Sequence, residues 1–464
     1  MKGKKTGMVV FLAFLACCFG LFMGQMALAD DAVVKVGVAM DQTGPLSIEG
    51  RKGLTAWKWY EEYINEEQGG WKDANGNTVK LEVLEGDTGF KPAKTMSLYK
   101  KFKGEGAVAI ANVGSVEVAA IRSRALKDRI PLSTNSGSLI YPLPSPCFGH
   151  WPDYTACSAA AIDYIKEKWE KSNSPWTKKR RPRMVFMGPE AYPSWQASIT
   201  PEVMRYAKLQ GVEVVGKPFI PIRPIDVKSM ILSAKAAGAD FIYTGIVVSQ
   251  GGAVVRDLYD LGLKGDPTKK EDKIEVIGMF PMSALEMIKL AGGRPEAVRH
   301  MRIIGSHAYI WEDGPTLDLI RKYAKKHGKE DLLDHNYVHE WYNAMRAGEA
   351  IKRALKKVPA KDLKGKDVWE AFLTIKDFDT GGIVPSKLSF SEEKRVGLEK
   401  VRVDKIVGDK GKRELVTYTD YKMLAPMYTK KYAKAHRKRS IYSIKSLELL
   451  DLDVDDVGYK RIKK

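Results

Sequence analysis

Short apolar segments alternate with segments of helical periodicity along most of this chain, and no other feature constrains its fold as strongly. A buried strand is expected at residues 33–39 and an amphipathic helix at 54–64, which ends at Gly69-Gly70 as glycine-terminated helices do. Strands that alternate with helices of this length predict a parallel sheet covered by helices. The sequence therefore predicts an α/β fold.

The alternation occurs twice, on either side of a proline-rich segment at 141–146 that suits a hinge strand. Before it, strands are expected at 79–84, 107–111 and 130–132, and helices at 92–102 and 116–126. After it, helices at 155–169, 195–209, 227–237, 253–261 and 284–290 alternate with strands at 184–187, 212–215, 241–243, 274–277 and 301–305. Helices at 316–327 and 336–356 and a β region at 378–407 follow. Two α/β units in tandem predict a cleft between them, where ligands commonly bind.

The amino terminus has the composition of a secretion signal. Three lysines precede an apolar run at 8–23, and Ala27-Leu28-Ala29 supplies a small-x-small cleavage pattern. We expect cleavage after Ala29 and export to the periplasm. A retained membrane anchor and a lipoprotein attached at Cys17 are the alternatives. No later segment holds 18 consecutive apolar residues, so a soluble product is expected.

The chain carries a formal net charge of +19, yet nucleic acid is not an expected partner. An export signal argues against it, and the sequence contains no recognition motif. Attraction to anionic membranes or anionic solutes, or simply a solvated basic surface, would account for the charge. An exported chain can oxidise its cysteines, and the sequence leaves open whether Cys147 and Cys157 form a disulfide.

Four ordered segments carry a family resemblance. They are VGVAMDQTGPLSIEGRKG at 36–53, LEVLEGDTGFKPA at 81–93, DFIYTGIVVSQGGAVVRDLYDLGL at 240–263 and FDTGGIVPSKLSFSEEKR at 378–395. Together they resemble the type I periplasmic binding proteins of ABC importers, and most closely the leucine/isoleucine/valine-binding group with its amide and urea relatives.

This resemblance implies two Rossmann-like lobes with parallel sheets, joined by a hinge of three crossings. Lobe 1 is expected to comprise 30–148 and 309–362, and lobe 2 to comprise 149–308 and 363–422, after the signal at 1–29. A basic extension at 423–464 has no role that the sequence explains. The resemblance further implies a monomer without a cofactor that closes over a small carboxylate- or amide-bearing solute, such as a branched-chain amino acid, and docks on a membrane permease. A ligand-sensing module of a membrane receptor is the alternative.

The resemblance also nominates ligand-binding residues. Ser115 follows a strand and begins a helix, where a hydroxyl can act as N-cap and the helix amino terminus can face a carboxylate. Asn135 and Ser136 lie in the turn after the next strand, the family's second carboxylate-binding element. Tyr192, in GPEAYPSW, corresponds to a tyrosine that contacts ligand from the second lobe, although Pro193 replaces the usual glycine.

One departure from the family concerns the ligand's ammonium group. Amino-acid-binding members place an acid on a loop of the second lobe, and aligning VIGMFPM at 276–282 puts Phe280 at that position. Glu49, in the first loop, could supply an acid instead. Ile246 and Val247 replace an aromatic pair and suit an apolar solute body, and they and Phe280 could equally be core residues. A buried ammonium without a partner costs several kcal/mol, so leucine-type ligands become less favoured.

No enzymatic activity is expected. The sequence contains neither a phosphate-binding loop nor a nucleophile elbow, so a hydrolase or dehydrogenase is not supported. His335 and His339 lie one helical turn apart beside Glu340, which is a spacing that metal ligands use. No third ligand is evident and aromatic residues follow, so ordinary packing is expected there and no metal site.

Overall fold

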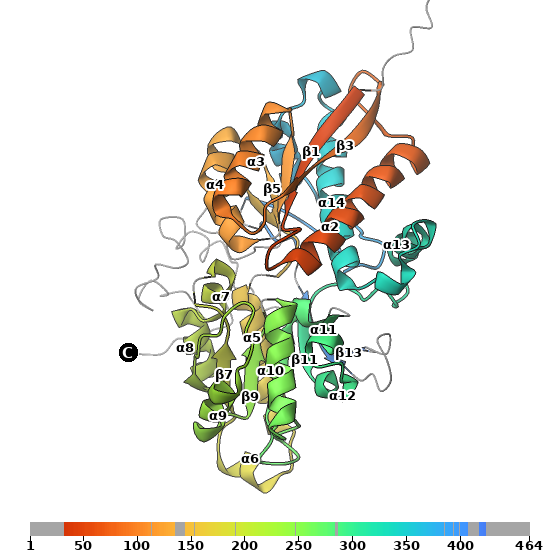
Figure 1. Cartoon of the computed structure of the whole chain (residues 1–464). Helices are drawn as coiled ribbons and strands as arrows, with labels where there is room; N and C mark the ends of the chain where they lie inside the picture. The colour runs from red at the N-terminus through yellow and green to blue at the C-terminus, as the bar shows by residue number, and fades with distance from the viewer. Residues whose placement is uncertain are drawn as a thin grey trace, which may run out of the picture.

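The computed structural model describes residues 32–112, 114–134, 144–152, 154–190, 192–245, 247–283, 286–384, 386–392, 394–398, 400–406 and 417–423. The signal with Cys17 and Ala29, the turn with Asn135 and Ser136, Ile246 and the extension beyond 423 lie outside them. No helix in the described ranges is long and apolar enough to span a bilayer. The chain forms two α/β lobes, stacked one above the other in Figure 1.

Lobe 1 is built on a six-stranded sheet in the order β2-β3-β1-β4-β5-β6. Its strands are β1 (Ala32–Met40), β2 (Trp71–Lys72), β3 (Thr78–Asp87), β4 (Ala109–Asn112), β5 (Leu132–Thr134) and β6 (Cys147–Gly149). All neighbours are parallel except β2 and β3. The central strand β1 buries Val34, Val36 and Val38, as a strand covered on both faces should.

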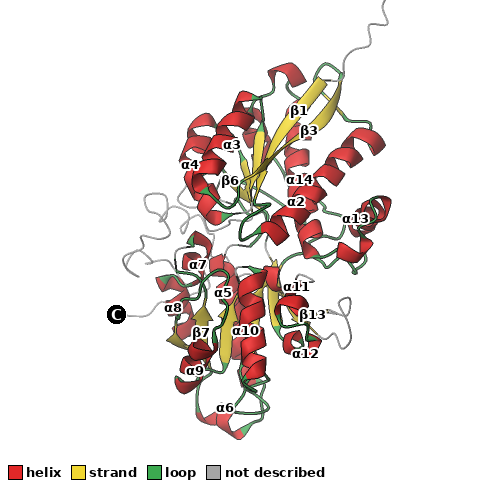
Figure 2. Cartoon of the chain, viewed as in Figure 1, coloured by secondary structure: helices red, strands yellow, loops and turns green. Residues whose placement is uncertain are grey.

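The helices of lobe 1 lie on both faces of its sheet, with α3 and α4 on one side and α2 and α14 on the other (Figures 1 and 2). They are α2 (Ser47–Glu62), its π-helical continuation (Tyr63–Glu67), α3 (Pro92–Gly104), α4 (Ser115–Asp128), α13 (Pro315–Lys326), α14 (His335–Leu355) and α15 (Gly365–Leu373), with short 3-10 turns at Glu330–Leu332 and Ala360–Asp362. Because the lobe 1 strands run parallel, β1, β4, β5 and β6 end at one edge of the sheet, which faces lobe 2.

Lobe 2 is built on a seven-stranded sheet in the order β13-β12-β11-β10-β9-β7-β8. Its strands are β7 (Arg183–Met187), β8 (Glu213–Gly216), β9 (Phe241–Thr244), β10 (Glu275–Met279), β11 (Arg302–Gly305), β12 (Lys400–Ile406) and β13 (Thr417–Met423). Only β12 and β13 run antiparallel to their neighbours. Alternate residues of β7 enter two separate cores, Met184 and Phe186 on one face and Val185 and Met187 on the other. The prediction of an α/β fold with two mostly parallel sheets is confirmed.

The helices of lobe 2 are α5 (Tyr154–Glu170), α6 (Pro175–Lys179), α7 (Pro193–Ser198), α8 (Pro201–Leu209), α9 (Lys228–Ala236), α10 (Val248–Asp260), α11 (Glu286–Leu290) and α12 (Pro295–Val298), with a 3-10 turn at Phe280–Ser283. The prediction of a single helix at 195–209 is wrong. The chain breaks it at Thr200, whose hydroxyl accepts a hydrogen bond from the Val203 amide and whose successor Pro201 begins α8.

Three crossings join the lobes, as the hinge prediction requires. The first follows β6, the second lies between β11 and α13, and the third directly precedes β12. They are hydrogen-bonded to one another: the Gly149 amide donates to the Arg395 carbonyl over 2.9 Å, and Arg402 Nη1 donates to the His307 carbonyl over 3.0 Å. The proline-rich segment is not itself the hinge strand, because β6 comes after it and still pairs with β5 in lobe 1.

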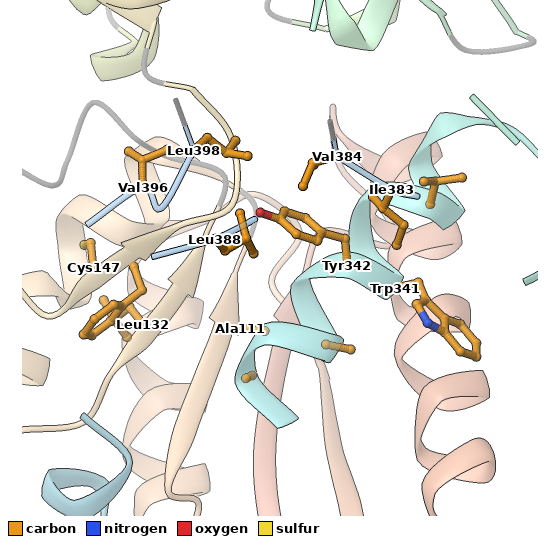
Figure 3. Packing of buried hydrophobic residues seen from close by; sticks show 14 of the residues in the cluster. Ala111, Leu132, Cys147, Trp341, Tyr342, Ile383, Val384, Leu388, Val396 and Leu398 are labelled. Atoms are coloured by element: carbon orange, nitrogen blue, oxygen red, sulfur yellow. The ribbon is translucent and has the colours of Figure 1, made fainter. Parts of the chain in front are cut away.

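One domain boundary differs from the expectation. Residues 363–398 were expected in lobe 2 but pack on lobe 1, where Phe372 of α15 stacks on Phe148 of β6 with 4.3 Å between ring centroids. Figure 3 shows Leu388, Val396 and Leu398 beside Leu132 and Cys147 of the lobe 1 sheet. The boundary at 362 is therefore wrong, and the chain returns to lobe 2 only at β12.

The described part of the chain contains two cysteines, and both are buried thiols. Cys147 lies in β6 and Cys157 in α5, on opposite sides of the first crossing, and no disulfide joins them. Burial raises the pKa of the Cys147 thiol, so this side chain behaves as a small apolar core residue.

Candidate functional site

A cavity of about 40 Å³ lies between the lobes, at the edge of the lobe 1 sheet where the parallel strands end. Lobe 1 and its helices contribute Leu46, Glu49, Phe90, Ser115, His339 and Glu340 to its lining. Lobe 2 contributes Tyr154, Tyr192, Ser194, Val247, Phe280 and Pro281. The carboxyl ends of parallel strands are where open α/β sheets bind ligands, so this cavity is the candidate site.

The loop after β1 fixes the start of α2 and thereby aims Glu49. Asp41 directly follows β1 and accepts hydrogen bonds from the amides of Thr43 (3.2 Å) and Leu46 (2.7 Å). Gly50 is required because a Cβ there would lie 1.8 Å from the Asp41 carbonyl oxygen. Only a glycine lets the first turn of α2 approach the strand this closely, and Glu49 in that turn then points into the cleft.

The Glu49 carboxylate is buried and reaches across to lobe 2. Its Oε1 accepts a 3.4 Å hydrogen bond from the amide of Val248, the first residue of α10, while Oε2 has no hydrogen-bond partner among the residues that the structure describes. Burial raises the pKa of Glu49 to about 7, against the lowering effect of backbone hydrogen bonds and with smaller contributions from nearby Glu286 and Asp334. The sequence-based placement of an acid in the cleft thus agrees with the geometry.

Lys52, one turn further along α2, forms a second contact between the lobes. Its Nζ lies 2.6 Å from Glu286 of α11 and 2.6 Å from Asp334, which precedes α14. Burial lowers the pKa of Lys52, but the two carboxylates outweigh it and the net pKa is raised. Lys52 is therefore a charged link between the two lobes.

Ser115 and Ser194 meet across the cleft, with their hydroxyl oxygens 3.1 Å apart and both side chains buried. Ser115 is the first residue of α4 rather than its N-cap, so the predicted capping role is wrong. Gly114 occupies that position, and no side chain caps the helix. The Ser115 hydroxyl is instead directed to Ser194 of lobe 2, and it lies at the amino terminus of α4, where the first amides of a helix have no partner within the helix.

Tyr192 reaches the cleft from lobe 2, as predicted. It precedes α7, and its ring stacks on Phe90 of lobe 1 with 5.6 Å between centroids and an interplanar angle of 16°. Pro193 begins α7 and so replaces the family's glycine without turning the ring away. Partial burial raises the pKa of the Tyr192 hydroxyl, which remains neutral in the physiological range.

Part of the lobe 2 wall of the cavity is apolar. Phe280 lies in the 3-10 turn after β10 and packs on Trp151 at 3.7 Å and on His339 at 4.9 Å between ring centroids. Val247 directly precedes α10 and is also buried. Phe280 therefore both lines the cavity and packs against its surroundings, and the carboxylates that line the cavity belong to lobe 1.

Sequence reasoning missed several residues that the fold brings to the cavity. Ser194 and Tyr154 lie at the amino ends of α7 and α5, and Ser194 is only two residues from the predicted Tyr192. Asp334 caps α14 by accepting from the Asn336 amide at 3.0 Å, and this directs the first turns of α14 into the cleft. His339 and Glu340 on those turns therefore line the cavity in addition to packing.

Comparison with known proteins agrees with this architecture. A family model described as periplasmic binding protein matches residues 33–412, so the chain belongs to the periplasmic binding protein family, in its type I branch. Members of this family are periplasmic solute-binding proteins. A search of curated proteins finds no match.

Solved structures with the same fold have low sequence identity. A branched-chain amino acid ABC transporter protein from Thermus thermophilus with bound valine is 19% identical, with a TM-score of 0.71 over 85% of this chain and 97% of that chain. A solute-binding protein of an ABC transporter from Rhodopseudomonas palustris HaA2, in complex with p-hydroxybenzoic acid, is 16% identical, with a TM-score of 0.64 over 83% and 97%. A fatty acid ABC transporter substrate-binding protein from Thermomonospora curvata is 18% identical, with a TM-score of 0.69 over 85% and 93%.

Proposed function

We propose that this protein captures a small carboxylate- or amide-bearing solute in the periplasm, after export directed by residues 1–29, and delivers it to the permease of an ABC importer. The observation that carries the proposal is the hydroxyl pair of Ser115 and Ser194, which closes the cleft at the amino terminus of α4. Helix amino termini with adjacent hydroxyls bind carboxylates through their unpaired amides and the helix dipole.

The shape of the cavity supports a small solute. Its volume of about 40 Å³ with the lobes closed corresponds to roughly three water molecules. A solute must therefore enter an opened cleft and be enclosed as the lobes close. Phe90, Tyr192, Val247 and Phe280 offer an apolar enclosure for a short aliphatic or aromatic body. A ligand that contacts both lobes favours the closed form by its differential affinity.

The class of solute depends on Glu49. An amino acid would bring an ammonium group, which the Glu49 carboxylate could pair with once it is ionised. A simple acid or amide would bring none, and the raised pKa of about 7 would allow Glu49 to be protonated beside it. Since Phe280 replaces the acid on the lobe 2 loop, we favour simple acids and amides over zwitterions.

A thermal-shift screen tests the proposal. The purified protein is heated with valine, p-hydroxybenzoate, short-chain acids, amides and urea, each as a separate sample. A ligand at 100 times its Kd stabilises the protein by about 2.7 kcal/mol. We expect at least one acid or amide to raise the Tm, and Ser115→Ala to reduce this shift while Ser97→Ala, on the exposed face of α3, does not. Absence of any shift with every solute, or a full shift in the Ser115 variant, would overturn the proposal.

A further inference from the structure

Three buried side chains converge at the base of the cleft on the side of α14. His150 directly follows β6 in the first crossing, while His339 and Glu340 lie on α14, and each is at most 2% exposed. One nitrogen from each histidine and one oxygen from Glu340 lie within 4.8 Å of one another. Helical spacing in the sequence suggests His335 as the partner of His339. In the folded chain the partners of His339 are Glu340 and His150, and His335 lies outside the group.

The Glu340 carboxylate is held in a fixed orientation. Its Oε2 accepts from Trp57 Nε1 at 3.1 Å and from Asn343 Nδ2 at 2.9 Å. Its Oε1 has no hydrogen-bond partner among the described residues and faces the two imidazoles. Hydrogen bonds that orient a ligating carboxylate through its other oxygen are common around protein metal ions.

The distances fit tetrahedral coordination. Oε1 of Glu340 lies 3.5 Å from His150 Nε2 and 3.6 Å from His339 Nδ1. Ligand bonds of zinc to nitrogen and oxygen imply separations of about 3.3–3.6 Å between two ligand atoms of a tetrahedron. Two of the three edges of a coordination tetrahedron thus have the expected length, and the third, between the two imidazole nitrogens, is at most 4.8 Å.

An unsatisfied imidazole nitrogen also points to a cation at the cluster. His150 Nε2, one of the three candidate ligand atoms, makes no hydrogen bond within the described ranges, and a buried polar atom without a partner is unfavourable.

We propose that His150, His339 and Glu340 form a binding site for a divalent transition-metal ion, with zinc as the best-matched ion. Two imidazoles and one carboxylate suit zinc, cobalt or nickel better than calcium or magnesium. Three protein ligands leave the fourth position open, and His339 and Glu340 both line the cavity. This proposal does not depend on which solute the protein carries.

The charge around the site defines what the fourth position accepts. Arg346 lies on α14 near the cluster, and its Nη groups donate to Gly149, Ser133 and Asn343 rather than to Glu340. A divalent cation beside this guanidinium and one carboxylate leaves the site with net positive charge. Water or an anion would therefore complete the coordination, and a bound carboxylate would be attracted.

Metal titration tests the proposal directly. The purified protein, carrying no polyhistidine tag, is freed of metal with a chelator and titrated with Zn²⁺ alone, and with Ca²⁺ as a control, by calorimetry. We expect one equivalent of Zn²⁺ to bind and Ca²⁺ not to bind. Co²⁺ should give the intense visible bands of tetrahedral coordination, which a merely structural histidine cluster would not produce.

Matched variants locate the ion. We expect Glu340→Gln and His150→Gln each to lower Zn²⁺ affinity by at least about tenfold. His335→Gln, a buried histidine one turn earlier on α14 but outside the cluster, should keep the wild-type affinity. The two cluster substitutions lie on different elements, so the test still works if one of the two variants misfolds. Thermal unfolding shows whether each variant is folded. Absence of Zn²⁺ binding by the wild type, wild-type affinity in both cluster variants, or an equal loss in His335→Gln would overturn the proposal.

Discussion

The two lobes contribute different chemistry to the same cleft. Lobe 1 presents titratable groups from α2 and α14, namely Glu49, Lys52 and Glu340, whereas the lobe 2 wall is mainly apolar at Val247 and Phe280. The carboxylates that line the cleft thus come from lobe 1, while lobe 2 supplies apolar side chains together with the hydroxyls of Tyr154, Tyr192 and Ser194.

The contacts between the lobes follow the same division. Glu49 of lobe 1 accepts from the backbone of Val248, and Lys52 of lobe 1 pairs with Glu286. The serine contact between Ser115 and Ser194 is uncharged and nearly symmetrical. Substitutions of lobe 1 charges should therefore have larger effects than substitutions of the uncharged contacts.

Lys52→Met should have the largest effect. It leaves Asp334, which is 1% exposed, and Glu286 without their shared cation, and removal of one partner from a buried ion pair costs about 3–5 kcal/mol. Denaturant unfolding measures the loss. Lys101→Met is the matched control because Lys101 pairs with Glu105 on the surface, where about 0–1 kcal/mol is expected. Equal losses in both variants would contradict the role of Lys52.

Glu49→Gln should change the dependence of stability on pH. The pKa of Glu49 is raised from 4.5 to about 7, so the folded state binds more protons than the unfolded state between these values. Its contribution to stability is present below pH 4.5 and is lost as pH rises through about 7, by about 3 kcal/mol.

Unfolding at a series of pH values measures this contribution. Buried Glu117 also has a pKa raised to about 7, so the wild-type curve contains both components. Glu49→Gln should remove one component, and Glu117→Gln should remove only the other. A Glu49→Gln curve that follows the wild-type slope would show that this carboxylate is hydrated.

A double-mutant cycle on Ser115 and Ser194 should give a smaller value. Each alanine substitution removes one hydroxyl of a buried pair 3.1 Å apart, and the coupling free energy should be about 1 kcal/mol. The same cycle measured with bound solute should give a different coupling if the solute replaces the direct contact. Additive losses of stability, both with and without bound solute, would show that the two hydroxyls do not interact.

The stack of Phe90 on Tyr192 should contribute least. Aromatic pairs add about 0.5–1.5 kcal/mol, and partial exposure of Tyr192 favours the lower end. A cycle with Phe90→Leu and Tyr192→Leu, followed by thermal unfolding, measures the coupling. Tyr192→Phe keeps the ring and is the control. If Tyr192→Phe lost as much stability as Tyr192→Leu, the effect would come from the hydroxyl and not from the stack.

The sequence predicts the fold well where periodicity is local. The strand expected at 33–39 and the helix expected at 92–102 differ from β1 and α3 by at most two residues at either end. The prediction fails where tertiary contacts decide the structure, as for α15, because no local pattern indicates that Phe372 stacks on Phe148 of lobe 1. It fails also at Thr200-Pro201, where a capping residue interrupts a segment of helical periodicity.

The cleft shows a similar limit. Glu49, Ser115, Tyr192 and Phe280 could be nominated because alignment on the family places each at a position near the ligand, and all four line one cavity. His150 could not, because its partners His339 and Glu340 lie on a distant helix and no spacing rule connects them. Sequence motifs can identify residues whose position depends on the local backbone. Side-chain clusters that form between distant segments at the hinge can be identified only from the structure.

Calorimetry of solute binding in two buffers of different ionisation enthalpy tests the division between the lobes most directly. An acid that binds near Glu49 at pH 7 should raise its pKa further, so wild-type protein should take up protons on binding and Glu49→Gln should not. An amino acid would lower that pKa and release protons instead. Binding with no proton exchange in the wild type, or with the same exchange in Glu49→Gln, would contradict a recognition role for the lobe 1 carboxylate.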